Sequence, residues 1–477
     1  MTRRTDSSRQ AAVANDAARI DQPRSLPLRA LRGGLGHGFA SLGVRNYRLY
    51  WSGQVVSLVG TWMQQVSLPW LVLELGGSAF QLGLVAVFQF LPAGLFAPFG
   101  GVIADRFSKR RLLVVTQLLA MAQAATLFTL TVTGVVDIPI IMVGALWLGL
   151  INALDMPVRQ SFAADLVPRD TLTNAIALNS MAFNSARVLG PALAGVLISV
   201  GAVAFGSAVA GVAINLGFNV VTYLAVLIGL LLMDPRRILQ RHEDGPHQPV
   251  FESLREGVAY ALRTPIVLWG LVLLGGIAAF GFNFQILLPL LATRILNLGA
   301  DGYGALFAAL GIGSLIGSLS LAFMRQRRAI HLMLGGGAVF GILEIALGLT
   351  SDALIAGALA LGTGLSSMLM VNTINATIQA NVSDRLRGRV MALFVTVFAG
   401  SAPLGSLFAG AVAEQWGASV AFIAGAVLSL AVLVVVAWRF RVAAGRGDLG
   451  ITRIDSRSGR TRGARPSDPT PKTSAAA

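Results

Sequence analysis

Residues 206–237 read GSAVAGVAINLGFNVVTYLAVLIGLLLMDPRR, an uncharged apolar run that ends at an aspartate, a proline and two arginines. A helix needs roughly 20 apolar residues to cross about 30 Å of hydrocarbon, and this run is long enough. A barrel strand crosses in about half that length, and only helices and closed barrels satisfy their own backbone hydrogen bonds in lipid. The stretch therefore predicts a transmembrane helix followed by a basic loop.

The same pattern recurs along the whole chain. Of its 477 residues, 55% are hydrophobic and only 12% are charged. The mean hydropathy is +0.71, which is too apolar for a water-exposed globule of this size. The sequence predicts an all-α integral membrane protein with twelve spans, near 50–73, 82–103, 112–134, 138–157, 175–200, 206–233, 266–292, 303–324, 331–350, 353–378, 389–412 and 417–439.

Arginine and lysine gather in the terminal segments and in every second loop. All but two of the 37 lie there; Arg187 lies inside the fifth span and Arg294 lies on the opposite face. By the positive-inside rule, both termini and the even-numbered loops are predicted to be cytoplasmic, with the bundle in the plasma (inner) membrane. This bias accounts for the net charge of +15 without a nucleic-acid partner, and it favours contact with membrane lipid.

Composition divides the chain into five segments. Residues 1–45 and 442–477 are polar and basic, and both are predicted to be disordered cytoplasmic tails, the first of them rather than a cleaved leader. Residues 46–233 and 266–441 each hold six spans, joined by a cytoplasmic linker over 234–265. The chain has no cysteine, so disulfides are excluded, and we expect a monomer without metal or cofactor.

The two halves carry the same features at a nearly constant offset. Gly190 and Gly195 of the fifth span fall opposite Gly405 and Gly410 of the eleventh span, an offset of 215 residues. Duplicated six-helix halves are typical of secondary transporters, whose site lies between the repeats near the middle of the bilayer. The repeat therefore predicts two pseudo-symmetric halves around a central cavity.

The loop after the second span reads Gly101-Val102-Ile103-Ala104-Asp105-Arg106-Phe107-Ser108-Lys109-Arg110-Arg111. It resembles the cytoplasmic loop signature of the major facilitator superfamily, with Ser108 in place of a glycine. In that reading, Asp105 pairs with Arg159 or with the helix start near Arg389, and this lock holds one conformation closed. The predicted gate residues are Gly101, Asp105, Arg106, Lys109, Arg110 and Arg159.

The fifth span carries the run Arg187-Val188-Leu189-Gly190-Pro191-Ala192-Leu193-Ala194-Gly195. Gly190, Pro191 and Gly195 predict a kinked helix that a neighbouring helix approaches closely. The run resembles, in shortened form, the Gly-Pro signature of exporters in this superfamily. Shorter matches at 45–48, 155–159 and 166–169 resemble the transmembrane secretion effector branch, which contains the enterobactin exporter and which implies efflux.

Polar residues inside the spans predict the transport path, because polar side chains avoid lipid. On the first span, Gln54, Ser57, Thr61 and Gln65 recur every three or four residues and so share one helix face. The resemblance implies that spans 1, 4, 7 and 10 line the cavity. The predicted path residues are Gln54, Thr61, Trp62, Gln64, Gln65, Asn152, Asn283, Gln285, Asn372, Asn375 and Gln379.

Ionisable residues in the spans are candidates for proton coupling. Asp155 is the leading candidate, and its alternative role is a static pair with Arg159 or Arg187. Arg187 either neutralises Asp155 or contacts an anionic substrate. Glu344 lies deep in the ninth span, where an unpaired carboxylate is costly, and Glu74 lies at the end of the first span.

Motifs of other protein classes do not occur in the sequence. It has no phosphate-binding loop with its Lys-Ser/Thr, no cluster of metal ligands and no nucleophile beside a base, so an ATP-driven pump and an enzyme are both disfavoured. We therefore predict a proton-coupled exporter, an antiporter, of a small amphiphilic molecule of the drug or siderophore class. The alternatives are a nutrient importer and a non-transporting sensor that works through its basic N-terminal tail.

Overall fold

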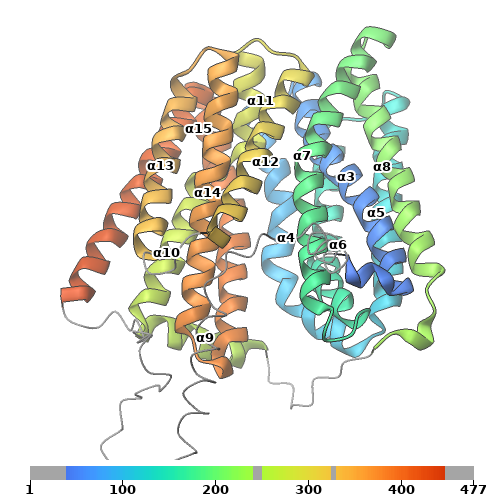
Figure 1. Cartoon of the computed structure of the whole chain (residues 1–477). Helices are drawn as coiled ribbons and strands as arrows, with labels where there is room; N and C mark the ends of the chain where they lie inside the picture. The colour runs from blue at the N-terminus through green and yellow to red at the C-terminus, as the bar shows by residue number, and fades with distance from the viewer. Residues whose placement is uncertain (1–38, 240–249, 324–328, 446–477) are drawn as a thin grey trace, which may run out of the picture.

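The computed structural model describes residues 39–239, 250–323 and 329–445; the side chains at 97–102, 104–106, 250, 251, 253, 254, 322, 323, 384 and 385 lie outside the description. Long helices run side by side in two groups (Figure 1). The first group holds α3 (Arg45–Glu74), α4 (Ala79–Arg106), α5 (Lys109–Val132), α6 (Ile138–Asp165), α7 (Leu172–Phe205) and α8 (Ala208–Leu231). The second group holds α10 (Pro265–Phe280), α11 (Phe284–Arg294), α12 (Ala300–Phe323), α13 (Ala329–Leu349), α14 (Ala353–Asn381) and α15 (Asp384–Gly445).

Among the described residues, 10 helices are long and apolar enough to cross a membrane. That set omits α3, which carries the stripe of glutamines and serines, and it counts Leu386–Gly445 once. Gly417 divides this last helix into two passes, because its φ of 86° is a backbone conformation that suits glycine. With α10 and α11 as one interrupted pass, the described chain makes twelve passes, and the predicted fold class is confirmed.

Side-chain caps begin several helices at one end of the bundle. Ser78 and Gln81 form a capping box at the start of α4. Asp137 accepts a hydrogen bond from the backbone N–H of Ile140 in α6, and Asp352 accepts from two first-turn N–H groups of α14. We call this end of the bundle, where α3 finishes, the far end. The other end, where α3 begins and the basic loops lie, is the basic end.

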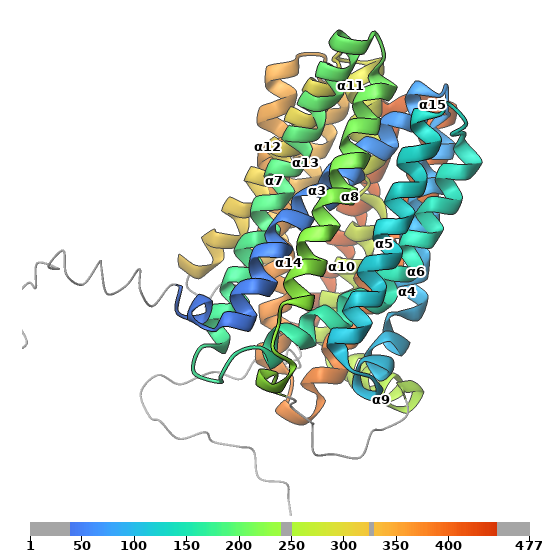
Figure 2. The same ribbon diagram turned by 90° about the vertical axis from the view of Figure 1, so that its right-hand side faces the viewer.

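The most extensive contacts between the halves are made by two pairs of helices. Within the first half, α3 packs against α8 and α4 against α6; within the second, α12 packs against α14 and α10 against α15. Between the halves, α4 packs against α15 and α7 against α12 (Figures 1 and 2). Because α4 is equivalent to α12 and α7 is equivalent to α15 in the repeat, the two inter-half pairs are equivalent to each other, as pseudo-symmetry requires.

Two segments predicted as tail or linker are partly ordered. Residues Ala40–Gly43 form a short 3₁₀ helix, and the Ser41 hydroxyl donates to the Asn174 side chain of α7 at 2.6 Å. The linker contains α9 (Val250–Arg263), whose Tyr260 hydroxyl donates to the Asn381 carbonyl at 3.1 Å. The linker is therefore anchored to the second half. Residues 1–38 and 446–477 of the predicted tails lie outside the described residues.

The seventh span is interrupted, whereas the sequence predicts a continuous run over 266–292. The helix stops at Phe280 and restarts at Phe284. The Asn283 amide donates to the carbonyl oxygens of Ala279 at 3.0 Å and Phe280 at 3.2 Å, which the break leaves without helical partners. A discontinuous helix at this depth is a feature of transporter binding regions.

Candidate functional site

Asp155 on α6 is the centre of a buried polar cluster in the first half. The side chain of Arg159 contacts its Oδ2 atom, with Nη2 at 2.6 Å and Nε at 2.8 Å. Its Oδ1 atom accepts from the Thr116 hydroxyl at 2.6 Å and from the Gln117 amide at 3.0 Å, both on α5. Asp155 is only 5% exposed. A buried ion pair is tolerated when hydrogen bonds satisfy its remaining lone pairs, and these four contacts do so.

The same cluster links α6 to α3. Arg159 also donates to the side-chain oxygen of Gln54, which is 5% exposed. Asp155 lies ten residues before the end of α6, which places it about 15 Å along the helix axis from the basic end. We call Asp155, Arg159, Gln54, Thr116 and Gln117 the Asp155 cluster. Its charge state therefore affects three helices at once.

Sequence reasoning identified Asp155, Arg159 and Gln54 but missed the two contributions of α5. The neighbours Thr116 and Gln117 interrupt an otherwise apolar third span, and that interruption was the available signal. Periodicity along one helix does not reveal which neighbouring helix a polar side chain meets. The partners of Asp155 from α5 therefore became visible only in the fold.

Arg187 does not pair with Asp155. Its guanidinium lies 5.9 Å from the centroid of the Trp62 ring, and this ring meets Phe183 edge to face at 5.7 Å. Arg187 forms no ion pair with the residues that the structure describes. A half-buried cation that faces an aromatic ring is suited to bind an anionic or aromatic group. Of the two alternatives for Arg187, the geometry retains substrate contact.

Gln64 and Thr61 have their hydrogen bonds within the first half. The Gln64 amide donates to Gln123 of α5 at 3.1 Å, and its oxygen accepts from Asn219 of α8 at 2.6 Å. Gln123 in turn donates to the Gly144 carbonyl of α6 at 3.1 Å. Thr61 donates to the Ser57 carbonyl of its own helix at 2.9 Å. Gln64 therefore lies on the face of α3 that packs against α5 and α8.

The remaining path residues are more accessible. Gln65, Asn152 and Gln285 are half-buried, and the structure gives them no hydrogen bond to another described residue. On α14, Asn372 donates to the Ser318 hydroxyl of α12 at 3.1 Å, and Gln379 donates to Asn375. Their roles in a transport path stay predictions.

Glu344 on α13 is fully buried. Its exposed fraction is 0%, and neither carboxyl oxygen has a hydrogen-bond partner among the described residues. It lies five residues from the far end of α13 rather than near the middle of the span. Because an unpartnered polar group in an apolar interior is costly, this carboxyl needs a functional or conformational explanation.

The described gate residues at the basic end bind within the first half. Lys109 forms an ion pair with Asp165 at 2.7 Å. Arg110 donates to the last carbonyls of α8, at 2.7 Å to Leu230 and 3.2 Å to Leu231, and so caps that helix. Arg159 belongs to the Asp155 cluster. The side chains of the other predicted members, Gly101, Asp105 and Arg106, lie outside the described residues.

The other proposed partner of Asp105 is also engaged elsewhere. Arg389 at the start of the eleventh pass forms an ion pair with Glu256 of α9. The predicted gate thus includes side chains that the structure uses to hold helix ends and the linker in place. The lock through Asp105 itself stays a prediction.

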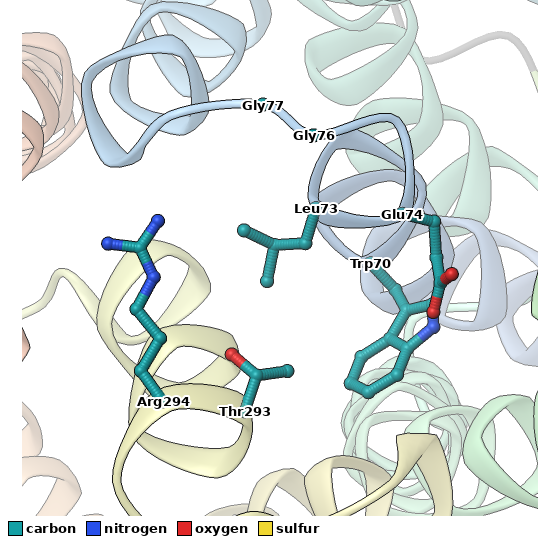
Figure 3. Close-up of a pocket in the computed structure, with 7 residues that line it drawn as sticks. All are labelled: Trp70, Leu73, Glu74, Gly76, Gly77, Thr293 and Arg294. Carbon is teal, nitrogen blue, oxygen red and sulfur yellow. The ribbon is translucent and has the colours of Figure 1, made fainter.

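A cavity of about 390 Å³ opens at the far end between the two halves (Figure 3). Trp70, Leu73 and Glu74 of α3 form one side, and Thr293 and Arg294 of α11 form the other. Glu74 and Arg294 are each the last residue of their helix. Arginine suits a helix C-terminus electrostatically and glutamate does not, so the acidic side of this cavity is not explained by helix stability.

Comparison with known proteins places these features in a family. A family model described as transmembrane secretion effector matches residues 36–451. The staphyloferrin A transporter of Staphylococcus aureus is 26% identical over 373 residues, covering 78% of this chain and 90% of the relative. The enterobactin exporter of Salmonella typhimurium is 26% identical, covering 76% and 85%. Macrolide efflux protein A of Streptococcus pyogenes is 23% identical, covering 81% and 93%.

Solved structures agree at the level of the fold. A bacterial homologue of the lysosomal transporter Spinster, in an inward-facing conformation, aligns with a TM-score of 0.64 at 17% identity, covering 85% of this chain and 97% of the other. A mutant form of the nucleoside transporter NupG aligns with a TM-score of 0.67 at 12% identity, covering 83% and 100%. At these identities the likeness supports the architecture alone.

Proposed function

The chain belongs to the transmembrane secretion effector family of the major facilitator superfamily, and we propose that it is a proton-coupled exporter of small amphiphilic molecules. As a member of that family it is a membrane transporter rather than an enzyme. Export, the coupling ion and the cargo class are our inferences. The observation that carries the proposal is the buried ion pair of Asp155 and Arg159 inside the first half.

The cargo class follows from the relatives and from one aromatic cluster. The names of the relatives give two siderophores and a macrolide as their cargo. In this chain, the Arg187 guanidinium of α7 lies over the Trp62 ring of α3, and that ring meets Phe183 edge to face. Such a surface favours an aromatic or anionic portion of an amphiphile. We therefore favour the siderophore type over a lipophilic cation.

Asp155 is the leading site for proton coupling. As a carboxylate it holds Arg159 and accepts from two residues of α5. Protonation removes the negative charge of Asp155 and weakens its ion pair with Arg159. Arg159 then keeps its hydrogen bond to Gln54 on α3. The relative positions of α3, α5 and α6 would therefore depend on whether Asp155 is protonated, and proton coupling requires such a dependence. Arg187 and Glu344 remain secondary candidates.

Orientation follows from charge. We place the basic end in the cytoplasm, and with it both termini, because the positive-inside rule is strong in this sequence. The far end, with Glu74, Asp301 and Glu414, then faces the outside. Cargo would enter between the halves from the basic end and leave at the far end.

Uptake into inside-out vesicles tests the proposal. A fluorescent amphiphile should accumulate in vesicles with an acidic interior, and collapse of the pH gradient should stop accumulation. In Asp155→Asn, we expect the dependence on the gradient to be lost. Asp165→Asn is the matched control, because Asp165 has the same 7% side-chain exposure and also pairs with a cation, Lys109. This control should keep its dependence on the gradient, whatever its rate.

The alternatives give different results. A nutrient importer would accumulate its substrate in right-side-out vesicles instead. A sensor would transport nothing in either orientation, and deletion of residues 1–38 would then abolish its signalling. Gradient-dependent uptake that persists in Asp155→Asn would remove Asp155 from the coupling mechanism and leave export in place.

A further inference from the structure

At the far end, the two halves meet along two pseudo-symmetric seams. In the α7–α12 seam, a Cβ atom at Gly195 would lie 2.5 Å from the Ala300 carbonyl oxygen and 3.0 Å from the Gly304 Cα. In the α4–α15 seam, a Cβ atom at Gly410 would lie 3.0 Å from the Ala79 carbonyl oxygen and 3.1 Å from the Gly83 Cα. Gly195 and Gly410 are equivalent in the repeat. Backbones therefore touch at the same place in both seams.

The reverse contacts are equivalent too. A Cβ atom at Gly304 would lie 2.6 Å from the Pro191 carbonyl oxygen, and one at Gly83 would lie 2.6 Å from the Ser406 carbonyl oxygen. Any side chain at these glycines would force the helices apart. The Gly-Pro run of the fifth span thus lies at the contact between the halves, and the kink predicted there stays a prediction.

One turn beyond these glycines, each seam carries a hydrogen bond to a helix start across the interface. Ser199 of α7 accepts from the backbone N–H of Asp301, in the first turn of α12, at 3.2 Å. Glu414 of α15 accepts from the backbone N–H of Phe80, in the first turn of α4, at 3.3 Å. Ser199 and Glu414 are separated by the same 215 residues as the two glycines.

These bonds act as helix caps supplied by the opposite half. The first N–H groups of a helix have no partner within it, so a side chain or water supplies one. In α4, the Ser78 hydroxyl caps Gln81, which leaves the N–H of Phe80 for Glu414. In α12, the Asp301 carboxylate also contacts the Ser199 hydroxyl at 3.2 Å. Parting the halves would expose both helix starts to water.

We propose that Ser199 and Glu414 are the outer-gate residues of this transporter, each holding one seam closed by capping the helix across it, so that both caps must release before the two halves part at the far end. This inference rests on the proposed transport function. It concerns how the gate is held, and it does not depend on cargo or coupling ion.

Thiol labelling tests the proposal without any transport assay. The chain has no cysteine, so Ser406→Cys introduces the only thiol; Ser406 is 5% exposed and lies in the α4–α15 seam. A membrane-impermeant maleimide is applied to the far-end face of intact cells. Gly304→Leu, which wedges the other seam, gives the labelling rate of an open gate. All variants are checked for a monodisperse peak in size-exclusion chromatography.

We expect Ser199→Ala and Glu414→Ala each to raise the labelling rate about two- to fivefold, because each removes exposed hydrogen bonding across one seam from the closed conformation alone. Glu414→Gln keeps an acceptor oxygen and should label close to the parent rate. Asp352→Ala is the matched control, since Asp352 caps its own helix at the same end within one half. Its labelling rate should not change.

Parent-like labelling in Ser199→Ala or in Glu414→Ala, beside fast labelling in Gly304→Leu, would overturn the proposal. Slow labelling in Gly304→Leu would also overturn the proposal, because wedging the α7–α12 seam would then not part the halves at the far end. Since the labelling rate reports the exposure of a thiol and not the flux of a substrate, failure of export in vesicles would leave this result intact and would count only against the proposed function.

Discussion

At the scale of single residues, neighbouring glutamines on α3 have opposite surroundings. Gln64 is 2% exposed and has partners on α5 and α8. Gln65 is half-buried and has no hydrogen-bond partner among the described residues. A polar side chain that is fully paired inside a half stabilises that half, whereas one left without a partner is available to cargo. The pair therefore separates a structural role from a transport role.

Replacement of each glutamine by leucine tests this distinction. Gln64→Leu leaves Gln123 and Asn219 without one partner each, so we expect a loss of roughly 1–3 kcal/mol in the free energy of unfolding. Gln65→Leu should change stability by less than about 0.5 kcal/mol and reduce transport. Thermal unfolding in detergent and vesicle uptake measure the two effects. Equal losses of stability would contradict the assignment.

The same residues show what sequence reasoning can reach. The i, i+4 spacing of Asp155 and Arg159 predicts their ion pair, because residues four apart are neighbours on a helix. The stripe on α3 predicts which residues avoid lipid. It does not predict that the side chain of Gln64, one position away from Gln65, bonds to α5 and α8. That information lies in the packing of helices far apart in sequence, such as α3 and α8.

At the scale of elements, most spans were predictable from length and hydropathy alone. The fifth predicted span, 175–200, lies inside α7, and the fourth, 138–157, begins where α6 begins. The break before Asn283 and the helix α9 were not predicted. Both depend on hydrogen bonds that hydropathy does not encode: local ones to Ala279 and Phe280 at the break, and a long-range one from Tyr260 to Asn381 for α9.

Arg110 shows how one basic residue of the gate motif acts on an element. Its guanidinium binds the last carbonyls of α8, where a cation is also favoured by the helix dipole. Arg110→Ala should loosen the last turn of α8 by roughly 1–2 kcal/mol, which makes amide exchange at Leu231 to Met233 about tenfold faster. Hydrogen–deuterium exchange measures this. Exposed Arg111 is the control, and faster exchange in Arg111→Ala would argue against the cap.

At the scale of the whole molecule, equivalent glycines of the repeat make equivalent helix contacts. Gly190 and Gly405 contact helices of their own half, through Trp62 and the Ala279 carbonyl oxygen, whereas Gly195 and Gly410 contact the other half. The offset of 215 residues was visible in the sequence. Which glycines face inward and which face across the interface was not visible, because it depends on how the two halves dock.

If the halves move as rigid bodies, a covalent link across one seam must stop transport. Ser199 and Asp301 lie close enough for their side chains to touch, at 3.2 Å, so the double variant Ser199→Cys/Asp301→Cys should form a disulfide in this cysteine-free chain. We expect oxidation to reduce vesicle uptake to background and a reductant to restore it. Loss of free thiols measures the extent of the link.

The control is Ser41→Cys/Asn174→Cys, which joins two segments of the first half whose side chains lie 2.6 Å apart. Oxidation of this pair should leave uptake unchanged, because no movement separates those segments. Full uptake through a completely linked α7–α12 seam would mean that the halves do not part there.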